Sequence, residues 1–258
     1  MELPSGFSQK MKGLLGDEWS DFLECYDQPK TFGLRVNTLK ISIDDFLSCI
    51  PFSLSPILWA KDGFYYDEQV QPGKHPYHAA GLYYIQDPSA MAPAVLLDVK
   101  PGDRVLDLCA APGGKSCQIG AALKGQGLLV ANEAHPIRVA ALGENIERLG
   151  IKNAIITQEQ PKRLAKLFQN FFDKILVDAP CSGEGMFRKN PAACSEWSED
   201  AVNYCSQRQQ DILCEAAAML RPGGRLVYST CTFSPEENEG TIDDFLKKHD
   251  DFEVITGN

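Results

Sequence analysis

Short apolar runs alternate with amphipathic segments from residue 82 onward, and this rhythm predicts alternating strands and helices. The apolar runs expected to form strands are 104–108, 128–131, 154–157, 174–177 and 225–228. The segments expected to form helices are 88–97, 114–123, 136–149, 161–171 and 199–220. Near-continuous apolar strands separated by helices are typical of a parallel sheet that is covered on both faces. The sequence therefore predicts an α/β fold built on a doubly wound, Rossmann-like sheet.

The first 80 residues lack this rhythm. Helical patterns cover 7–15 and 19–26, a strand-like run covers 31–39, and a further helix is expected after Ser42. We therefore expect a small α+β N-terminal module over residues 1–80 and one larger α/β domain over residues 81–258. The sequence contains no internal repeat and no low-complexity linker.

Composition narrows the class of protein. A chain of 258 residues can bury roughly 70–75% of its unfolded surface without external cross-links. Its nine cysteines include no CxxC pair, and its four histidines have no ligand spacing, so a disulfide framework or a metal site is not expected. No apolar run approaches the roughly 20 residues of a membrane helix, and no secretory signal is visible. We expect a cytoplasmic monomer with no metal and no membrane partner.

The formal net charge of −10 argues at first against a polyanionic partner, because nucleic-acid affinity depends largely on Lys and Arg contacts with phosphates. The charge is unevenly distributed, however. Residues 232–258 contain eight acidic and two basic side chains and so hold −6 of the total. The remaining 231 residues carry only −4. The acidity of the C-terminal segment therefore does not exclude a nucleic-acid partner.

A glycine-containing turn links the strand at 104–108 to the next helix. Asp107 ends the strand, Ala110-Ala-Pro-Gly-Gly114 makes the turn, and Lys115 begins the helix, so that the backbone can come close to a ligand at the helix N-terminus. The following strand delivers Glu133, 20 residues past Gly113. A carboxylate at that offset is placed to accept hydrogen bonds from the ribose hydroxyls of an adenosine.

Three other interpretations of this turn are weaker. A phosphate-binding P-loop requires a glycine where the chain has Cys109, and Cys109 and Pro112 also break the dinucleotide pattern G-x-G-x-x-G. A purely structural turn remains open from these residues alone. The cofactor that best fits an acid at Glu133 without a pyrophosphate loop is S-adenosylmethionine.

Two cysteines, Cys181 and Cys231, each lie just past a predicted strand. If the sheet is doubly wound, strands 174–178 and 225–230 are neighbours about 4.8 Å apart, and both cysteines leave the same carboxyl edge. Ser234-Pro-Glu-Glu237 resembles a capping box and predicts a helix that begins there. The six cysteines that fall on helical patterns are expected to be structural: Cys25, Cys49, Cys117, Cys194, Cys205 and Cys214.

Thiols beside a methyl donor fit the methylation of a pyrimidine at carbon 5. That carbon is too weak a nucleophile to take a methyl group directly, but a thiolate that adds to carbon 6 creates an enamine that can. A base must then remove the carbon-5 proton before the thiol leaves, and the surroundings must favour the thiolate. Asp178, at the end of the strand before Cys181, is the candidate carboxyl group that faces the base.

These residues resemble the Nol/Nop/Sun family of RNA 5-methylcytosine methyltransferases, and within it the bacterial ribosomal-RNA branch. The resemblance rests on motifs along nearly the whole chain, namely Arg35-Val-Asn-Thr-Leu-Lys40, Tyr84-Ile-Gln-Asp-Pro-Ser-Ala-Met91, Cys109-Ala-Ala-Pro-Gly-Gly-Lys115, Asp178-Ala-Pro-Cys-Ser-Gly and Ser229-Thr-Cys-Thr-Phe-Ser-Pro-Glu-Glu-Asn-Glu. It implies that Cys231 is the nucleophile and that Cys181 assists product release. It also implies that S-adenosylmethionine is held by Cys109, Ala110, Ala111, Pro112, Gly113, Gly114, Lys115, Glu133 and Asp178.

The chain departs from the family pattern at two places. The segment expected to meet the adenine reads Thr157-Gln-Glu-Gln-Pro161, and the sequence does not show which of its residues takes that role. The chain also stops at Asn258, before the stretch that supplies a last strand and, in the ribosomal branch, a further RNA-binding domain. We therefore expect a truncated version.

The resemblance implies an RNA substrate, with ribosomal RNA as the first expectation. Arg35, Asn37 and Lys40 could contact phosphates, or they could equally form a polar strand edge. Arg188 and Lys189 could neutralise an unstacked RNA segment while Phe187 stacks on it, or the three could cover the sheet edge. Three other functions stay open: a tRNA substrate, a DNA cytosine methyltransferase, and an RNA-binding fragment that binds cofactor but turns over weakly.

Overall fold

The computed structural model describes residues 3–255, and the chain divides into two compact units. The sheet unit comprises residues 30–178 and 215–228, and the helical unit comprises residues 3–29, 179–214 and 229–255. The chain end at Asn258, on which the predicted truncation rests, lies outside the described residues.

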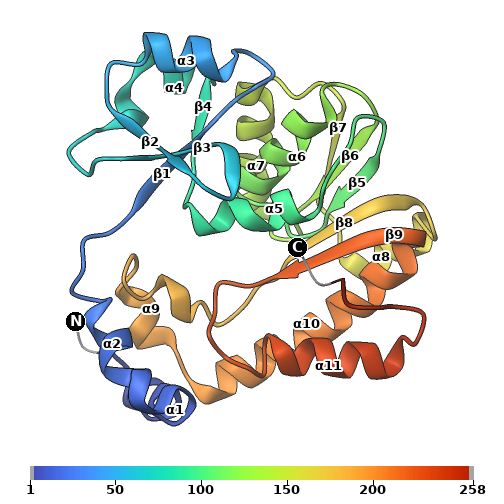
Figure 1. Cartoon of the computed structure of the whole chain (residues 1–258). Helices are drawn as coiled ribbons and strands as arrows, with labels where there is room; N and C mark the ends of the chain where they lie inside the picture. Colours follow the sequence, from blue (N-terminus) through green and yellow to red (C-terminus); the bar gives the residue numbers. More distant parts are fainter. Residues whose placement is uncertain (1–2, 256–258) are drawn as a thin grey trace. The chain divides into compact units, whose positions relative to one another are not determined.

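The larger sheet of the sheet unit has the strand order β7-β6-β5-β8-β9 (Figure 1). Its strands are β5 (Arg104–Asp107), β6 (Leu128–Asn132), β7 (Ala154–Thr157), β8 (Phe172–Asp178) and β9 (Leu220–Ser229). The pairs β5–β6, β6–β7 and β5–β8 are parallel. Since the chain runs outward from β5 to β7 and then returns to β8 on the other side of β5, the predicted doubly wound sheet is confirmed. The expected pairing of β8 with β9 is also confirmed.

Helices occupy the connections between these strands. They are α5 (Ala92–Leu96), which follows the short helix η3 (Ser89–Met91), α6 (Gly114–Leu123), α7 (Pro136–Leu149), α8 (Pro161–Leu167) and α10 (Glu199–Met219). Helix α8 ends four residues earlier than predicted because Asn170 takes a left-handed φ of 49° and Phe172 already belongs to β8.

The core of the larger sheet explains its apolar strands. Leu97, Leu123, Leu142 and Leu176 belong to one buried cluster that joins α5, α6 and α7 to the sheet. In Figure 1, α6 and α7 lie along β5, β6 and β7. Successive residues Val105 and Leu106 of β5 point to opposite faces, and both are fully buried. The sheet is therefore covered on both sides at its central strand, as the hydrophobic pattern predicted.

The sheet unit also contains a smaller antiparallel sheet of order β2-β3-β1-β4. Its elements are β1 (Phe32–Val36), α3 (Ile43–Cys49), β2 (Leu54–Ile57), β3 (Ala60–Tyr66), η2 (Pro72–Lys74), α4 (Pro76–Ala79) and β4 (Tyr83–Ile85). Ser42 caps α3 by accepting from the backbone of Asp45 at 3.1 Å. Strand β4 follows residue 80 yet pairs with β1. The division into domains at residue 80 stays a prediction.

The helical unit gathers segments from both ends of the chain. It holds α1 (Ser5–Leu15), η1 (Gly16–Glu18), α2 (Trp19–Glu24), η4 (Glu184–Met186), α9 (Ala192–Glu196), the first part of α10 and α11 (Glu239–Lys248). Phe187 is fully buried there and packs edge-on against Phe7 with ring centroids 5.0 Å apart. The hypothesis that Phe187 stacks on RNA is therefore wrong, because its ring belongs to the core of this unit.

Among the described residues 3–255, none of the helices is both long enough and apolar enough to cross a membrane. Nor do three or more His, Cys, Asp or Glu side chains gather there as a metal ion would require.

Candidate active site

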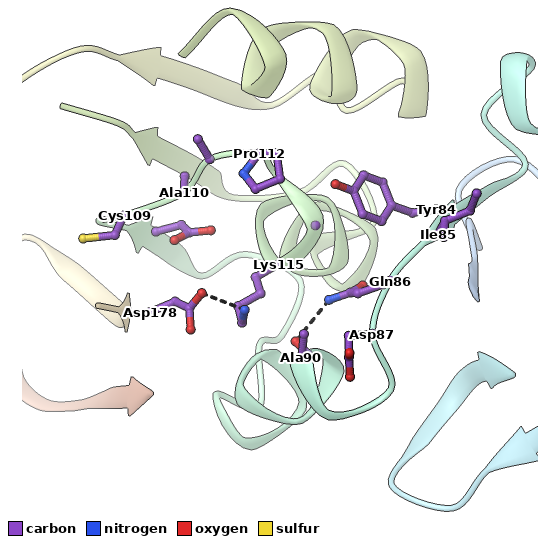
Figure 2. A pocket seen from close by; sticks show the side chains of 13 residues that line it. Tyr84, Ile85, Gln86, Asp87, Ala90, Cys109, Ala110, Pro112, Lys115 and Asp178 are labelled. Atoms are coloured by element: carbon purple, nitrogen blue, oxygen red, sulfur yellow. Dashed lines mark hydrogen bonds and ion pairs between the residues drawn. The ribbon is translucent and has the colours of Figure 1, made fainter. Parts of the chain in front are cut away.

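A pocket of about 210 Å³ opens at the carboxyl end of β5, where the strand order of the larger sheet reverses (Figure 2). Such switch points are where open α/β sheets bind ligands. The predicted turn lines it with Cys109, Ala110, Ala111, Pro112, Gly114 and Lys115, and the end of β8 adds Asp178. Gly113 is not part of the lining. It is the left-handed residue, with φ of 109°, that precedes α6 as its N-cap.

Lys115 and Asp178 point toward one another across the pocket in Figure 2. Lys115 Nζ donates to Asp178 Oδ2 at 2.7 Å, and about a third of the Asp178 side chain is exposed. The pair joins the N-terminus of α6 to the carboxyl end of β8. The pocket thus presents one cationic and one anionic side chain to a ligand.

The pocket also contains residues that the sequence analysis did not propose as site residues. Tyr84, Ile85, Gln86, Asp87 and Ala90 form another part of its lining. They come from β4 and the segment after it. All of them lie within the motif 84–91 that carried the family resemblance, so the motif was the available signal.

Gly114 shows how closely this part of the lining approaches the turn. A Cβ atom at Gly114 would lie 3.0 Å from Cε1 of Tyr84 and 3.6 Å from Cδ of Gln86. Gln86 in turn donates to the carbonyl of Ala90 at 3.1 Å (Figure 2). A side chain at the second glycine of the turn would therefore need the Tyr84 ring to move by a few tenths of an ångström.

Asp107 closes the base of the pocket. It is buried, and its Oδ2 accepts a hydrogen bond from Ser116 Oγ at 2.6 Å. Burial raises the pKa of Asp107 to about 7, and the hydrogen bond from Ser116 opposes that rise. This carboxyl group therefore titrates near neutral pH.

Glu133 lies at the end of β6 and is 5% exposed, but it is not part of the pocket lining. Its Oε1 accepts from the backbone N–H of His135 at 2.9 Å, and its Oε2 lies 3.4 Å from Nη1 of Arg138. Arg138 also donates to the carbonyl of Ala111 at 2.6 Å. Arg138, which the sequence analysis did not propose, therefore connects Glu133 to the pocket turn.

The segment expected to meet the adenine is held by Asn132. The side chain of Asn132 donates to the carbonyl of Glu159 at 3.0 Å and accepts from Thr157 Oγ1 at 2.9 Å and from the backbone N–H of Glu159 at 3.0 Å. This orders residues 157–159 after β7. Which of Gln158, Glu159 and Gln160 meets an adenine stays open.

The two cysteines proposed for the chemistry are in contact within the helical unit. Cys181 Sγ lies 3.2 Å from Cys231 Sγ, and the backbone N–H of Cys231 donates to Cys181 Sγ at 3.3 Å. A disulfide bond would require about 2.05 Å, so the sulfurs are not covalently bonded. Cys231 is exposed and Cys181 is half-buried. The predicted juxtaposition of these two thiols is present.

The contact separates the two thiols chemically. The hydrogen bond with Cys231 and burial raise the pKa of Cys181 above its ordinary value. Cys181 therefore stays protonated at neutral pH and can donate its S–H to Cys231. When one sulfur of such a pair loses its proton, removal of the second proton becomes harder. Cys231 is the more exposed of the two cysteines.

The predicted capping box after Cys231 is wrong. Helix α11 begins at Glu239, and its N-cap residue Asn238 makes no side-chain capping bond. Ser234 instead donates to Glu184 Oε1 at 2.7 Å, and Glu237 accepts from the backbone N–H of Ser182 at 2.9 Å. The residues that match the capping pattern are therefore engaged by partners about fifty positions away.

Arg35, Asn37 and Lys40 connect the two sheets of the sheet unit. Buried Arg35 donates to Gln86 Oε1 and to the carbonyl of Gly114, both at 3.1 Å. Buried Asn37 donates to the carbonyls of Gly81 and Leu149, and exposed Lys40 donates to those of Ala80 and Arg148. Their contact with RNA stays a prediction, and in this structure they fix the smaller sheet against the larger one.

Arg188 and Lys189 follow Cys181 in the helical unit. Arg188 is half-buried and donates to the carbonyl of Cys25 at 2.7 Å, whereas Lys189 is exposed. The structure thus leaves Lys189 accessible and ties Arg188 to the end of α2. Their role in RNA binding also stays a prediction.

The residues of the pocket fit S-adenosylmethionine. The amino-acid part of that cofactor carries a carboxylate and an ammonium group beside a sulfonium, and the pocket offers Lys115 together with the carboxylate of Asp178. The buried carboxylate of Glu133 lies at the end of the adjacent strand, and Gly114 admits close approach at the start of α6. The turn lacks the glycine patterns of phosphate-binding loops, because Cys109 and Pro112 interrupt them, and both residues line the pocket.

Comparison with known proteins agrees with this geometry. A family described as "16S rRNA methyltransferase RsmB/F" matches residues 94–258, and one described as "N-terminal domain of 16S rRNA methyltransferase RsmF" matches residues 3–88. The chain is similar to the ribosomal RNA small subunit methyltransferase F of Serratia proteamaculans (strain 568), with 39% identity over 96% of the chain and 54% of that protein. The enzyme of the same name from Vibrio vulnificus (strain YJ016) is 42% identical over 92% of the chain and 52% of that protein.

The chain spans about half the length of these curated relatives. Among solved structures, it is similar to a methyltransferase homologue from Pyrococcus horikoshii, with a TM-score of 0.80 and 36% identity over 90% of the chain and 74% of that protein. The match of the family description covers the larger sheet, the pocket turn and both cysteines. The chain therefore belongs to the RsmB/F family of 16S rRNA methyltransferases, which is the Nol/Nop/Sun family that its motifs resemble.

Proposed function

We propose that this chain methylates carbon 5 of a cytosine in RNA, with S-adenosylmethionine as the methyl donor and a covalent bond between Cys231 and the base as the intermediate. The observation that carries the proposal is the 3.2 Å contact between Cys181 Sγ and Cys231 Sγ. A single thiol suffices for addition to a pyrimidine. A second thiol in contact with it can serve as the base that removes a proton before the first thiol leaves.

The sheet unit supplies the cofactor site in this proposal. Lys115 pairs with the cofactor's carboxylate, Asp178 faces its cationic groups, and Glu133 accepts hydrogen bonds from its ribose. When bound, S-adenosylmethionine supplies an electrophilic methyl group. The packing of Tyr84 against Gly114 and the bonds of Arg138 hold the turn in place for this purpose.

The two cysteines supply the chemistry on the base. The Cys231 thiolate forms a bond to carbon 6 while an acid protonates or hydrogen-bonds ring nitrogen 3, and carbon 5 gains the electron density that it needs to accept a methyl group. After methylation, the carbon-5 proton passes to Cys181, the electron pair re-forms the double bond between carbons 5 and 6, and the Cys231–carbon bond breaks. We assign the acid role to Asp178 in its protonated form, whose proton passes to nitrogen 3 as Cys231 adds and returns to the carboxylate as Cys231 leaves.

The raised pKa of Cys181 fits this order of events. Its first cause is the hydrogen bond with Cys231. Once Cys231 is bonded to carbon, its sulfur no longer carries a negative charge, and that cause is removed. Cys181 then gives up its proton to solvent more readily, and the resulting thiolate can act as the base that takes the carbon-5 proton.

The names of the relatives support ribosomal RNA of the small subunit as the substrate. The test is transfer of a labelled methyl group from S-adenosylmethionine to isolated small-subunit ribosomal RNA, followed by digestion to nucleosides. We expect label in 5-methylcytidine. Label only in transfer RNA would change the substrate, label in a DNA duplex would change the class, and cofactor binding without transfer to any of these would identify a binding fragment.

A further inference from the structure

Two fully buried carboxylates cross between the loops that carry the cysteines. The first cysteine loop (residues 179–187) contains Glu184, whose carboxylate reaches the second cysteine loop (residues 230–238). Glu184 Oε2 accepts from Thr232 Oγ1 at 2.9 Å and from the backbone N–H of Phe233 at 3.0 Å. Glu184 Oε1 accepts from Ser234 Oγ at 2.7 Å and from Trp197 Nε1 at 2.9 Å.

The second loop returns the contact with Glu237, which is also fully buried. Glu237 Oε2 accepts from the backbone N–H of Ser182 and from Gln209 Nε2, each at 2.9 Å, and its Oε1 accepts from Ser182 Oγ. Each cysteine loop thus contributes one carboxylate that accepts hydrogen bonds from the other loop. We call Glu184 and Glu237 the carboxylate clamp.

The backbone beside the cysteines shows how closely the two loops approach. The N–H of Gly185 donates to the carbonyl of Cys231 at 2.9 Å. A Cβ atom at position 185 would lie 2.9 Å from that same oxygen, so only glycine fits without a shift. The clamp and this contact together fix Cys231 against the first loop, with its sulfur in reach of Cys181.

A carboxylate is suited to this task because both of its oxygens only accept hydrogen bonds. An amide of the same shape donates from one side. At Glu184, one oxygen meets the indole N–H of Trp197 and the other meets the backbone N–H of Phe233, and neither donor can reverse its bond. Glutamine at position 184 must therefore break one link whichever way its amide turns.

We propose that Glu184 and Glu237 are positioning residues that set the separation of the Cys181 and Cys231 sulfurs and thereby select Cys231 as the thiolate. The catalytic part of this inference rests on the proposed function. The part that concerns the thiols does not, because it can be measured on the protein without RNA and without cofactor.

The experiment compares Glu184→Gln with the wild-type chain and with Glu239→Gln. The control removes the same charge from a residue close to Glu237 in the chain, but Glu239 is exposed in the first turn of α11. Each protein is alkylated with iodoacetamide from pH 5.5 to 9, and modification of Cys231 is quantified by peptide mass spectrometry. The exposed Cys49 on α3 serves as the internal standard.

We expect the pH midpoint of Cys231 alkylation in Glu184→Gln to rise by at least half a unit relative to wild type and Glu239→Gln. In the methyl-transfer assay, we expect kcat to fall by about tenfold or more while KM for RNA stays within about threefold. The reason is that the substitution changes the position of the thiols and not the binding of RNA. An unchanged alkylation midpoint in a folded Glu184→Gln protein would overturn the inference. If the wild type transfers no methyl group at all, the proposed function fails, while the alkylation profiles still decide the role of the clamp.

Circular dichroism establishes whether Glu184→Gln is folded. If it is not, Thr232→Val takes its place, because valine keeps the shape of threonine and removes only the hydroxyl that donates to Glu184. The same upward shift of the midpoint, smaller in size, is expected for this variant. A folded Thr232→Val protein with a wild-type midpoint would count against the proposal.

Discussion

Cys181 and Cys231 share two hydrogen bonds although they are 50 positions apart in the chain: their sulfurs lie 3.2 Å apart, and the backbone N–H of Cys231 points at the sulfur of Cys181. The second bond means that Cys181 can accept as well as donate. A sulfur with a fixed N–H donor is stabilised whenever it carries negative charge. Cys181 can therefore hold a proton before the reaction, and its thiolate is stabilised once that proton is lost.

Replacing Cys231 by alanine is expected to abolish methyl transfer while the affinity for S-adenosylmethionine stays within a few-fold. The thiolate acts on the base and not on the methyl donor. Transfer is measured by filter binding of labelled RNA, and affinity by titration calorimetry. Cys49→Ala, at an exposed position on α3, is the matched control and is expected to behave as wild type. Substantial turnover by Cys231→Ala would remove its assignment as nucleophile.

Replacing Cys181 by serine is expected to trap a covalent complex of protein and RNA through Cys231. Addition and methylation survive in this variant, but serine is a far weaker acid and cannot take part in proton removal, so elimination stalls. A denaturing gel with labelled RNA should show a slowly migrating band, and the double variant that also carries Cys231→Ala should lack it. Normal turnover without such a band would make Cys181 a structural residue.

Glu133→Ala is expected to weaken binding of S-adenosylmethionine by roughly 2–4 kcal/mol, because it removes charge-assisted hydrogen bonds to the ribose. It also releases Arg138, which holds the carbonyl of Ala111. Titration calorimetry measures the effect. Glu144→Ala, an exposed change on the same helix as Arg138, should leave the affinity unchanged. Equal affinity in both variants would place the cofactor elsewhere.

Arg35→Ala is expected to lower the free energy of unfolding by about 2–4 kcal/mol, because it leaves two acceptors in the interior without their donor. Arg35 is 1% exposed and bonds to Gln86 and to the carbonyl of Gly114, with Asp62 at 3.7 Å. Urea denaturation provides the measurement, with exposed Lys30→Ala as the control. A loss below about 1 kcal/mol would show that the two sheets are held together mainly by other contacts.

Asp107→Asn is expected to change how stability depends on pH. The pKa of Asp107 is raised by burial to about 7 in the folded chain, against 3.8 for an ordinary carboxyl group. As pH rises from 3.8 to 7, the unfolded state loses this proton first, so the folded state loses stability across that window. Asparagine does not ionise and escapes the loss.

The free energy of unfolding of Asp107→Asn, relative to wild type, should therefore increase by about 2–3 kcal/mol between pH 5 and pH 8. Urea denaturation at the two pH values measures this difference. The exposed Glu68→Gln provides a charge-matched control with no such trend. A difference between Asp107→Asn and wild type that stays constant with pH would mean that Asp107 ionises in the folded chain as easily as in the unfolded one.

Local patterns predicted most of the larger sheet because its central strands β5, β6 and β8 are runs of largely buried apolar side chains and helices separate them. Helices α6 and α7 have the predicted bounds, and strands β5 to β9 lie where apolar runs placed them. The pocket turn was predictable for the same reason, since a glycine with positive φ must start α6. Such features depend on residues that are close in sequence.

The residues that escaped prediction depend on partners far along the chain. Ser234 and Glu237 match a local capping pattern. Instead, Ser234 donates to the carboxylate of Glu184, and Glu237 accepts from the backbone N–H of Ser182 in the other cysteine loop. Tyr84 and Gln86 belong to no sequence spacing that indicates a catalytic or binding role. They line the pocket because the Tyr84 ring packs against Gly114. Such contacts depend on tertiary packing, which cannot be predicted from hydrophobic periodicity.

The contact between Tyr84 and Gly114 has a consequence for how this family can diverge. The ring belongs to the segment matched by the N-terminal family description, which ends at residue 88, and the glycine belongs to the one that begins at residue 94. Neither segment contains a whole pocket. A Cβ atom at residue 114 would lie 3.0 Å from the Tyr84 ring, so a side chain there would need that ring to move by a few tenths of an ångström. An exchange of the N-terminal segment would therefore preserve this pocket best where the incoming segment carries a ring of similar size opposite Gly114.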